Sequence, residues 1–68
     1  MTLKRMMIKA AEVFDGVFVS YSRPDVGSHR RLCWEAELYN ADHFEDIIAK
    51  GKTPEEAMAR AMQKAKLL

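Results

Sequence analysis

The strongest constraint on the fold is a helix start near the C-terminus, at residues 51–56 (GKTPEE). Thr53 suits an N-cap, Pro54 suits the first helical position, and Glu56 stands three residues after Thr53, the spacing of a capping box. The apolar residues that follow recur at helical spacing and are Ala57, Met58, Ala61, Met62, Ala65 and Leu68. We therefore predict a helix over about 54–67, with one apolar stripe that packs against another layer.

Residues 31–39 alternate in polarity, which predicts a half-buried strand. One face carries Leu32, Trp34, Ala36 and Leu38, and the other carries Arg31, Cys33, Glu35, Glu37 and Tyr39. We expect the first face, with Trp34 at its centre, to lie beneath the C-terminal helix. Residues 44–50 follow a turn at 40–42 and predict a further short strand.

The N-terminal quarter fits two structures. Asp15-Gly16 lies between apolar segments rich in β-formers, which favours a hairpin with Phe14 opposite Val17. The alternative is a helix over about 2–15 that ends at Gly16. Its apolar face would consist of Leu3, Met6, Met7, Ala10, Val13 and Phe14.

These elements predict a single α+β domain spanning residues 1–68. It has a small antiparallel sheet of three to four strands, with the C-terminal helix on one face; the alternative order is αβββα. The predicted core joins Phe14, Val17, Val19, Tyr21, Leu32, Trp34, Ala36 and Leu38 to Ala57, Met58, Ala61, Met62 and Ala65. A domain of 68 residues has only marginal stability, so association with a partner is expected to supplement it.

Composition excludes several classes of protein. Eleven Lys and Arg against ten Asp and Glu give a net charge of +1, unlike a strongly basic nucleic-acid binder. No apolar run approaches the roughly 20 residues of a membrane span, and the first residues lack the apolar stretch of a signal peptide. The single cysteine excludes an internal disulfide and indicates a reducing compartment. We expect a cytoplasmic protein.

The residues that could carry catalysis or bind a metal are not arranged for either role. Four residues along a strand separate His29 from Cys33 by roughly 13 Å, too far for a nucleophile and its base. His43 could approach Cys33 across strands, but the spacing does not require it. Closely spaced Cys and His pairs, typical of zinc sites, are missing, and the acids at 42–46 lack the pattern of a calcium loop. We expect no enzyme, no cofactor and no metal.

Two surfaces are candidate binding sites. With the helix on the Trp34 side, the opposite sheet face would leave an apolar patch in water, which is typical of an interface. We predict a homodimer or target interface there, centred on Val13 and Phe18 with Arg31, Glu35, Glu37 and Tyr39 around them. A helix over 2–15 that covered this face would leave a monomer without the patch. Separately, a basic loop and two lysines are candidate anion or nucleic-acid contacts: Arg23, Arg30, Arg31, Lys50 and Lys52.

About half of the chain resembles known small domains. Residues 49–57 (AKGKTPEEA) are similar to the HicB-type antitoxin module, in which a short sheet runs into a Gly-x-Thr-x-Glu-Glu-Ala helix start. A strand containing Trp34 followed by Thr-Pro-x-Glu-Ala resembles small phage and prophage α+β proteins. The phage resemblance implies a non-enzymatic protein that binds a host protein or complex, including a defence system, in the host cytoplasm. The antitoxin resemblance implies a partner of a small toxin.

The αβββα alternative resembles the double-stranded-RNA-binding domain. The length fits, and residues 27–29 (GSH) fall where that family has a Gly-Pro-x-His loop. The family places a lysine cluster at the start of its last helix, on the RNA phosphates. Here that position holds residues 54–56 (PEE), which would repel phosphate and argue against RNA binding in the family's manner.

Overall fold

The computed structural model describes residues 2–21, 34–41 and 46–68. The elements are α1 (Leu3–Ala11), β1 (Gly16–Tyr21), β2 (Trp34–Tyr39), β3 (Ile47–Gly51) and α2 (Pro54–Lys64). The protein therefore has a small α+β fold in the order αβββα. The N-terminal hairpin that we favoured is wrong, and the helical alternative for this segment is correct in kind. The helix ends at Ala11, with Glu12 as its C-cap, and not at Gly16.

Helix α1 forms because its apolar residues share one face and Thr2 caps its start. The Thr2 hydroxyl accepts a hydrogen bond from the Arg5 backbone N–H at 3.2 Å. Met6 and Ala10 are buried, and Leu3 and Met7 pack against the same core. Asp15-Gly16 then acts as a helix-to-strand connection, because Gly16 opens β1 and pairs with Tyr39 of β2.

The three strands form one antiparallel sheet in the order β1-β2-β3. Val17 pairs with Leu38 in the first ladder, and Leu38 pairs with Ile47 in the second. The Asp15 carboxylate also accepts a hydrogen bond from the Ala41 N–H at 2.8 Å. This bond joins the α1–β1 connection to the end of β2 and so fixes the entry of the chain into the sheet.

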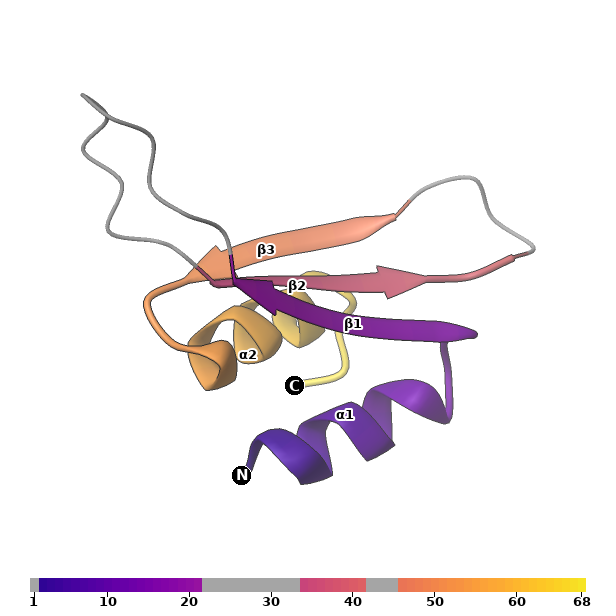
Figure 1. Cartoon of the computed structure of the whole chain (residues 1–68). Coiled ribbons are helices and arrows are strands. Elements are labelled where there is room, and N and C mark those ends of the chain that lie inside the picture. Colours follow the sequence, from indigo (N-terminus) through magenta and orange to yellow (C-terminus); the bar gives the residue numbers. More distant parts are fainter. Residues whose placement is uncertain (1, 22–33, 42–45) are drawn as a thin grey trace.

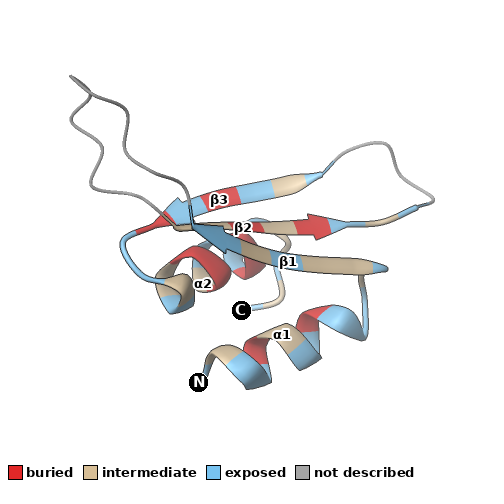
Figure 2. Ribbon diagram, in the orientation of Figure 1, coloured by how far each residue is buried: buried red, intermediate tan, exposed pale blue. Residues whose placement is uncertain are grey.

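Both helices lie on the same side of the sheet (Figure 1). The buried residues come from α1, from α2 and from the sheet face that the helices cover (Figure 2). They are Met6, Ala10, Ala36, Leu38, Ala49, Ala57, Met58, Ala61 and Met62. Of the predicted core, Phe14, Val17, Val19, Trp34 and Ala65 pack partly buried against this cluster, Tyr21 is exposed, and Leu32 lies outside the described residues.

Small residues on the covered face let α2 approach the sheet closely. A Cβ atom at Gly51 would lie 2.5 Å from the backbone nitrogen of Ala57, which is closer than atoms can pack. Trp34, at the same end of the sheet, is half-buried rather than fully buried. Its ring meets that of Tyr21 edge-on, with centroids 5.2 Å apart. Trp34 therefore closes one end of the core instead of forming its centre.

Helix α2 begins where predicted and ends earlier. The Thr53 hydroxyl accepts a hydrogen bond from the Glu56 N–H at 3.0 Å, as the capping sequence requires. At the other end, Lys66 has φ 60°, and the Leu67 N–H donates to the Met62 carbonyl at 2.8 Å. This Schellman-type reversal ends the helix at Lys64 rather than 67. Within residues 2–21, 34–41 and 46–68, no helix is long and apolar enough to cross a membrane.

Candidate interaction surfaces

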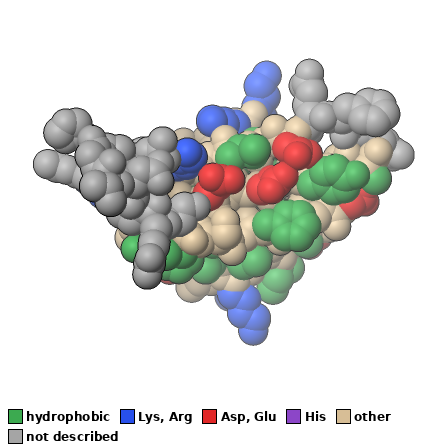
Figure 3. All heavy atoms as spheres, turned by 45° about the horizontal axis from the view of Figure 1, so that its top comes forward, with side chains coloured by type: hydrophobic (Ala, Val, Ile, Leu, Met, Phe, Trp, Pro, Cys, Tyr) green, Lys and Arg blue, Asp and Glu red, His purple; other side chains and the backbone are tan. Residues whose placement is uncertain are grey.

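The side of the sheet that faces away from both helices is the first candidate site, and we call it the open face. Strand register places eight residues on it: Gly16, Phe18, Ser20, Glu35, Glu37, Tyr39, Ile48 and Lys50. Asp46, which precedes β3, joins them through a side-chain hydrogen bond with Glu37. Three large apolar side chains are exposed there, with accessible fractions of 55% for Phe18, 41% for Tyr39 and 42% for Ile48. Hydrophobic and acidic side chains intermingle on this face (Figure 3).

The Phe18 ring lies along the sheet surface instead of standing out from it. A Cβ atom built on Gly16 would meet the Phe18 ring at 2.7 Å and the Tyr39 Cβ at 3.4 Å. The ring therefore occupies the space that a side chain at position 16 would fill, and it reaches towards Tyr39. Because Phe18 and Ile48 flank Glu37 on opposite sides, the apolar area spans all three strands.

Glu37 occupies the centre of the open face and has a perturbed acidity. A side-chain hydrogen bond with Asp46 raises the pKa of Glu37 above its ordinary value. Partial desolvation, repulsion from Asp46 and repulsion from Glu35 raise this pKa further. Among the residues that the structure describes, three carboxylates thus share the face with one cation, Lys50, which lies opposite Glu35 at the other end.

The structure brings together four of the six residues predicted for the interface: Phe18, Glu35, Glu37 and Tyr39. The prediction that Val13 belongs to this interface is wrong. Val13 follows α1 and is not in the sheet, although its side chain is exposed. Arg31 lies outside the described residues. We did not predict that Ile48 and Asp46 belong to the interface. Residues 46–50 alternate as a strand does, but we did not assign which of them share a face.

The alternative in which a helix over 2–15 covers the open face is wrong. Helix α1 packs against α2 and the same side of the sheet. Neither helix therefore covers the open face, because both pack on the opposite side of the sheet.

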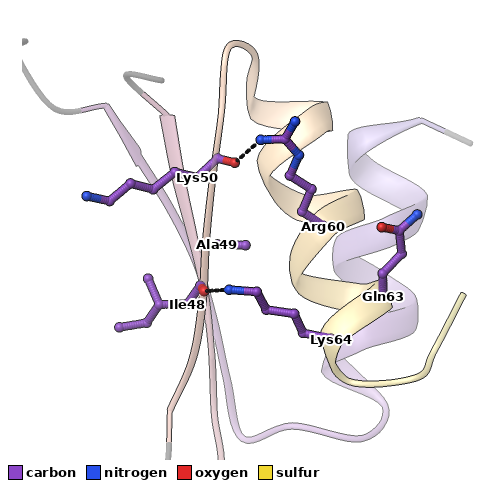
Figure 4. Close-up of a pocket in the computed structure, with 6 residues that line it drawn as sticks. All are labelled: Ile48, Ala49, Lys50, Arg60, Gln63 and Lys64. Carbon is purple, nitrogen blue, oxygen red and sulfur yellow. Dashed lines mark hydrogen bonds between the residues drawn. The ribbon is translucent and has the colours of Figure 1, made fainter. Parts of the chain in front are cut away.

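The second candidate site is a groove of about 540 Å³ along the outer edge of β3. Residues of β3 and of α2 line it: Ile48, Ala49, Lys50, Arg60, Gln63 and Lys64. The side chains of Ile48 and Lys50 point away from α2, so these two residues meet α2 through their backbone (Figure 4). Lys64 Nζ donates to the Ile48 carbonyl at 2.8 Å, and Arg60 Nη1 donates to the Lys50 carbonyl at 3.0 Å. Arg60 also pairs with Glu56 at 2.9 Å.

The predicted basic contacts are only partly described. Lys50 borders both the open face and the groove, and Lys52 is exposed in the turn between β3 and α2. Three arginines fall outside the described residues, as do the residues considered for catalysis. They are Arg23, Arg30, Arg31, His29, Cys33 and His43. The contribution of Arg60 and Lys64 was not anticipated, although their spacing of four places both on one side of a helix.

Comparison of the chain with models of protein families, with curated proteins and with solved structures gives no match.

Proposed function

We propose that this protein is a small non-enzymatic binding protein that docks a partner protein on its open face. The observation that carries the proposal is the exposure of Phe18, Tyr39 and Ile48 together, on a sheet face that neither helix covers. An apolar patch rimmed by charge is the usual character of a protein interface.

The charge of the open face favours a partner that contributes a cation. In the described part of this face, Glu35, Glu37 and Asp46 stand against a single cation, Lys50, and Glu37 lies at the centre between two apolar side chains. An Arg or Lys set among apolar residues would neutralise this cluster while Phe18 and Ile48 lose their exposure to water. We infer that the partner presents a basic side chain surrounded by apolar ones.

A second copy of the chain is the alternative occupant. In a two-fold face-to-face dimer, the central residue of one face meets its own copy, so two Glu37 side chains would approach each other. Such a contact costs free energy at neutral pH and less at acid pH, where Glu37 takes up a proton. A homodimer would therefore tighten as the pH falls, and sedimentation at two pH values distinguishes it from a heterologous partner.

The resemblance to small phage and prophage proteins extends the proposal to the partner's origin. On that ground the partner is a host protein or complex, with a defence system as one class and the host cytoplasm as the place of action. The resemblance to HicB-type modules makes a small toxin the second class of partner. Both classes are compatible with a basic, partly apolar docking surface.

Nucleic acid is a less supported ligand. The αβββα order agrees with that of the double-stranded-RNA-binding domain, but the first turn of α2 carries Glu55 and Glu56. Two carboxylates there repel the phosphates that the family's lysines hold. A gel shift with duplex RNA at two salt concentrations tests this alternative, and salt-sensitive binding would favour it over the open face.

The proposal is tested with a defined probe, a capped Leu-Arg-Trp tripeptide titrated into labelled protein and followed by amide NMR shifts. We expect shifts centred on Phe18, Glu37 and Ile48, and none with a Leu-Glu-Trp peptide. Glu37→Gln should raise the dissociation constant about fivefold, which is the loss expected from removing one partly exposed ion pair.

The matched control uses two exposed isoleucines. Ile48→Thr on the open face should weaken peptide binding, whereas Ile8→Gln on α1, with 54% of Ile8 accessible, should not. Equal effects of the two variants, or peptide shifts located on the helices, would overturn the proposal.

A further inference from the structure

The outer edge of β3 presents hydrogen-bonding groups that the sheet does not use. Ile48 and Lys50 lie opposite Glu37 and Glu35, and α2 side chains bind the carbonyls of both β3 residues. In an antiparallel ladder, residues of such non-hydrogen-bonded pairs direct both N–H and C=O away from their partner strand. The N–H groups of Ile48 and Lys50 therefore point into the groove beside α2.

The groove is rich in donors. Lys64 and Arg60 occupy the two outward carbonyls, whereas no described residue accepts from the two outward N–H groups. The groove also contains the charges of Arg60 and Lys64, of which Arg60 is partly neutralised by Glu56. The Lys50 side chain points to the other side of β3 (Figure 4). A ligand that fits this site must bring acceptors and negative charge.

The spacing of the donors selects the shape of that ligand. The N–H groups of Ile48 and Lys50 are two residues apart along a strand, roughly 6.7 Å. Arg60 and Lys64 are four residues apart on a helix, roughly 6 Å along its axis. The two repeats nearly coincide, since Lys64 lies beside Ile48 and Arg60 beside Lys50. An extended chain with a carboxylate at every second residue has the same repeat.

We propose that the β3–α2 groove binds an extended acidic segment of a partner protein, with Asp or Glu at alternate positions. Backbone carbonyls of the segment accept from the N–H groups of Ile48 and Lys50. Its carboxylates form ion pairs with Lys64 and Arg60. Both side chains are exposed and can turn from the β3 carbonyls to the ligand. Recognition is then a form of strand addition in which charge and register together give specificity.

The competing interpretation is edge protection. Lysine and arginine on an edge strand discourage pairing with other chains, and capping of the two carbonyls would serve that purpose alone. Edge protection predicts that Lys64→Gln and Arg60→Gln increase self-association. Acidic-segment binding predicts that the same variants lose a ligand without gaining self-association.

The experiment uses two capped peptides of one composition, with three Glu and three Val. One alternates Glu and Val, and the other has its three Glu contiguous. Calorimetry should show that the alternating peptide binds at least about fivefold more tightly, and NMR should show slowed exchange of the Ile48 and Lys50 N–H groups. Lys64→Gln should weaken this binding about fivefold, whereas Lys4→Gln on α1 should leave it unchanged.

Three results would overturn the inference: equal affinity for the two peptides, equal affinity of Lys64→Gln and wild type, or no binding of either peptide. Failure here is distinguishable from failure of the open-face proposal. Phe18→Thr lies outside the groove and should leave the acidic peptide bound, and Lys64→Gln lies outside the open face and should leave the Leu-Arg-Trp peptide bound.

Discussion

The two faces of the sheet differ although the same strands supply both. On the covered face, Ala36 and Leu38 have no accessible surface, and the small residues Ala49 and Gly51 let α2 settle close to the backbone. On the open face, Phe18 and its neighbours are larger, more exposed and mixed with carboxylates. On the covered face, the need to pack against α2 therefore determines residue size. On the open face, packing does not explain which residues are present.

This difference indicates that the covered face supplies stability and that the open face is available for binding. Within the described residues, the fully buried side chains all lie on the covered face or on the helices that pack on it. A small domain buries little apolar surface in total, so these positions tolerate little change. The open face contributes little to folding, because its large side chains are already in contact with water. Substitutions that alter binding without unfolding the protein should therefore be found on the open face.

The largest expected effect comes from two neighbours in β2 that lie on opposite faces. Leu38→Ala should lower the free energy of unfolding by about 2–5 kcal/mol, because Leu38 is fully buried and a cavity would remain. Tyr39→Ala should cost about 1 kcal/mol or less, because 41% of Tyr39 is accessible. Urea unfolding measures both. Similar losses from the two variants would erase the distinction between the faces.

A smaller effect is expected at two glycines. Gly51→Ala should destabilise the fold by about 1–3 kcal/mol, because the new Cβ would strike the α2 backbone at Ala57. Gly16→Ala places a Cβ 2.7 Å from the end of the Phe18 ring, which is free to turn into solvent. Thermal unfolding of the two variants should show a clear loss for Gly51→Ala and little change for Gly16→Ala; the reverse order would contradict the account.

The smallest effect concerns pH. The raised pKa of Glu37 means that the native state holds this proton more tightly than the unfolded chain. Its contribution to stability is fully present below the ordinary value of 4.5 and is lost as the pH rises through the folded-state pKa. Glu37→Gln should therefore be slightly more stable than wild type at pH 7 and should lack this part of the pH dependence.

Denaturation curves at pH 4 and pH 7 measure this effect. Glu12→Gln, after α1, is the control and should keep the wild-type pH profile. Identical profiles for wild type and Glu37→Gln would show that the carboxylates of the open face do not interact.

The elements that the sequence predicts correctly are those with a local pattern, either helix capping or alternation of polarity. Thr53 and Glu56 have the capping spacing, and β2 alternates along its whole length, so α2 and β2 were identified with the correct facing. The segment 44–50 correctly indicated a strand at Ile47–Gly51. Each of these signals lies within about ten residues, which is the range over which periodicity and capping operate.

The N-terminal segment could not be settled in this way, because two local signals conflict. Asp15-Gly16 fits a tight turn and a connection after a helix equally well. The helical arrangement comes with long-range contacts that no local pattern shows: Met6 and Ala10 are buried in the core, and the Ala41 N–H donates to the Asp15 carboxylate, 26 residues away. The side of the sheet that α1 covers also follows from tertiary packing against α2. For the same reason, the groove between Lys64 and Ile48 joins residues whose proximity no local pattern indicates.

The central claim is that one sheet face is open to a partner, and two adjacent isoleucines of β3 test it most directly. Ile47 faces the helices and packs against the core, whereas Ile48 is 42% accessible on the other side. A soluble paramagnetic agent should broaden the Ile48 methyl signals strongly and the Ile47 signals weakly in methyl-labelled protein. Equal broadening of the two, or protection of Ile48 in the free protein, would show that the face is not open as described.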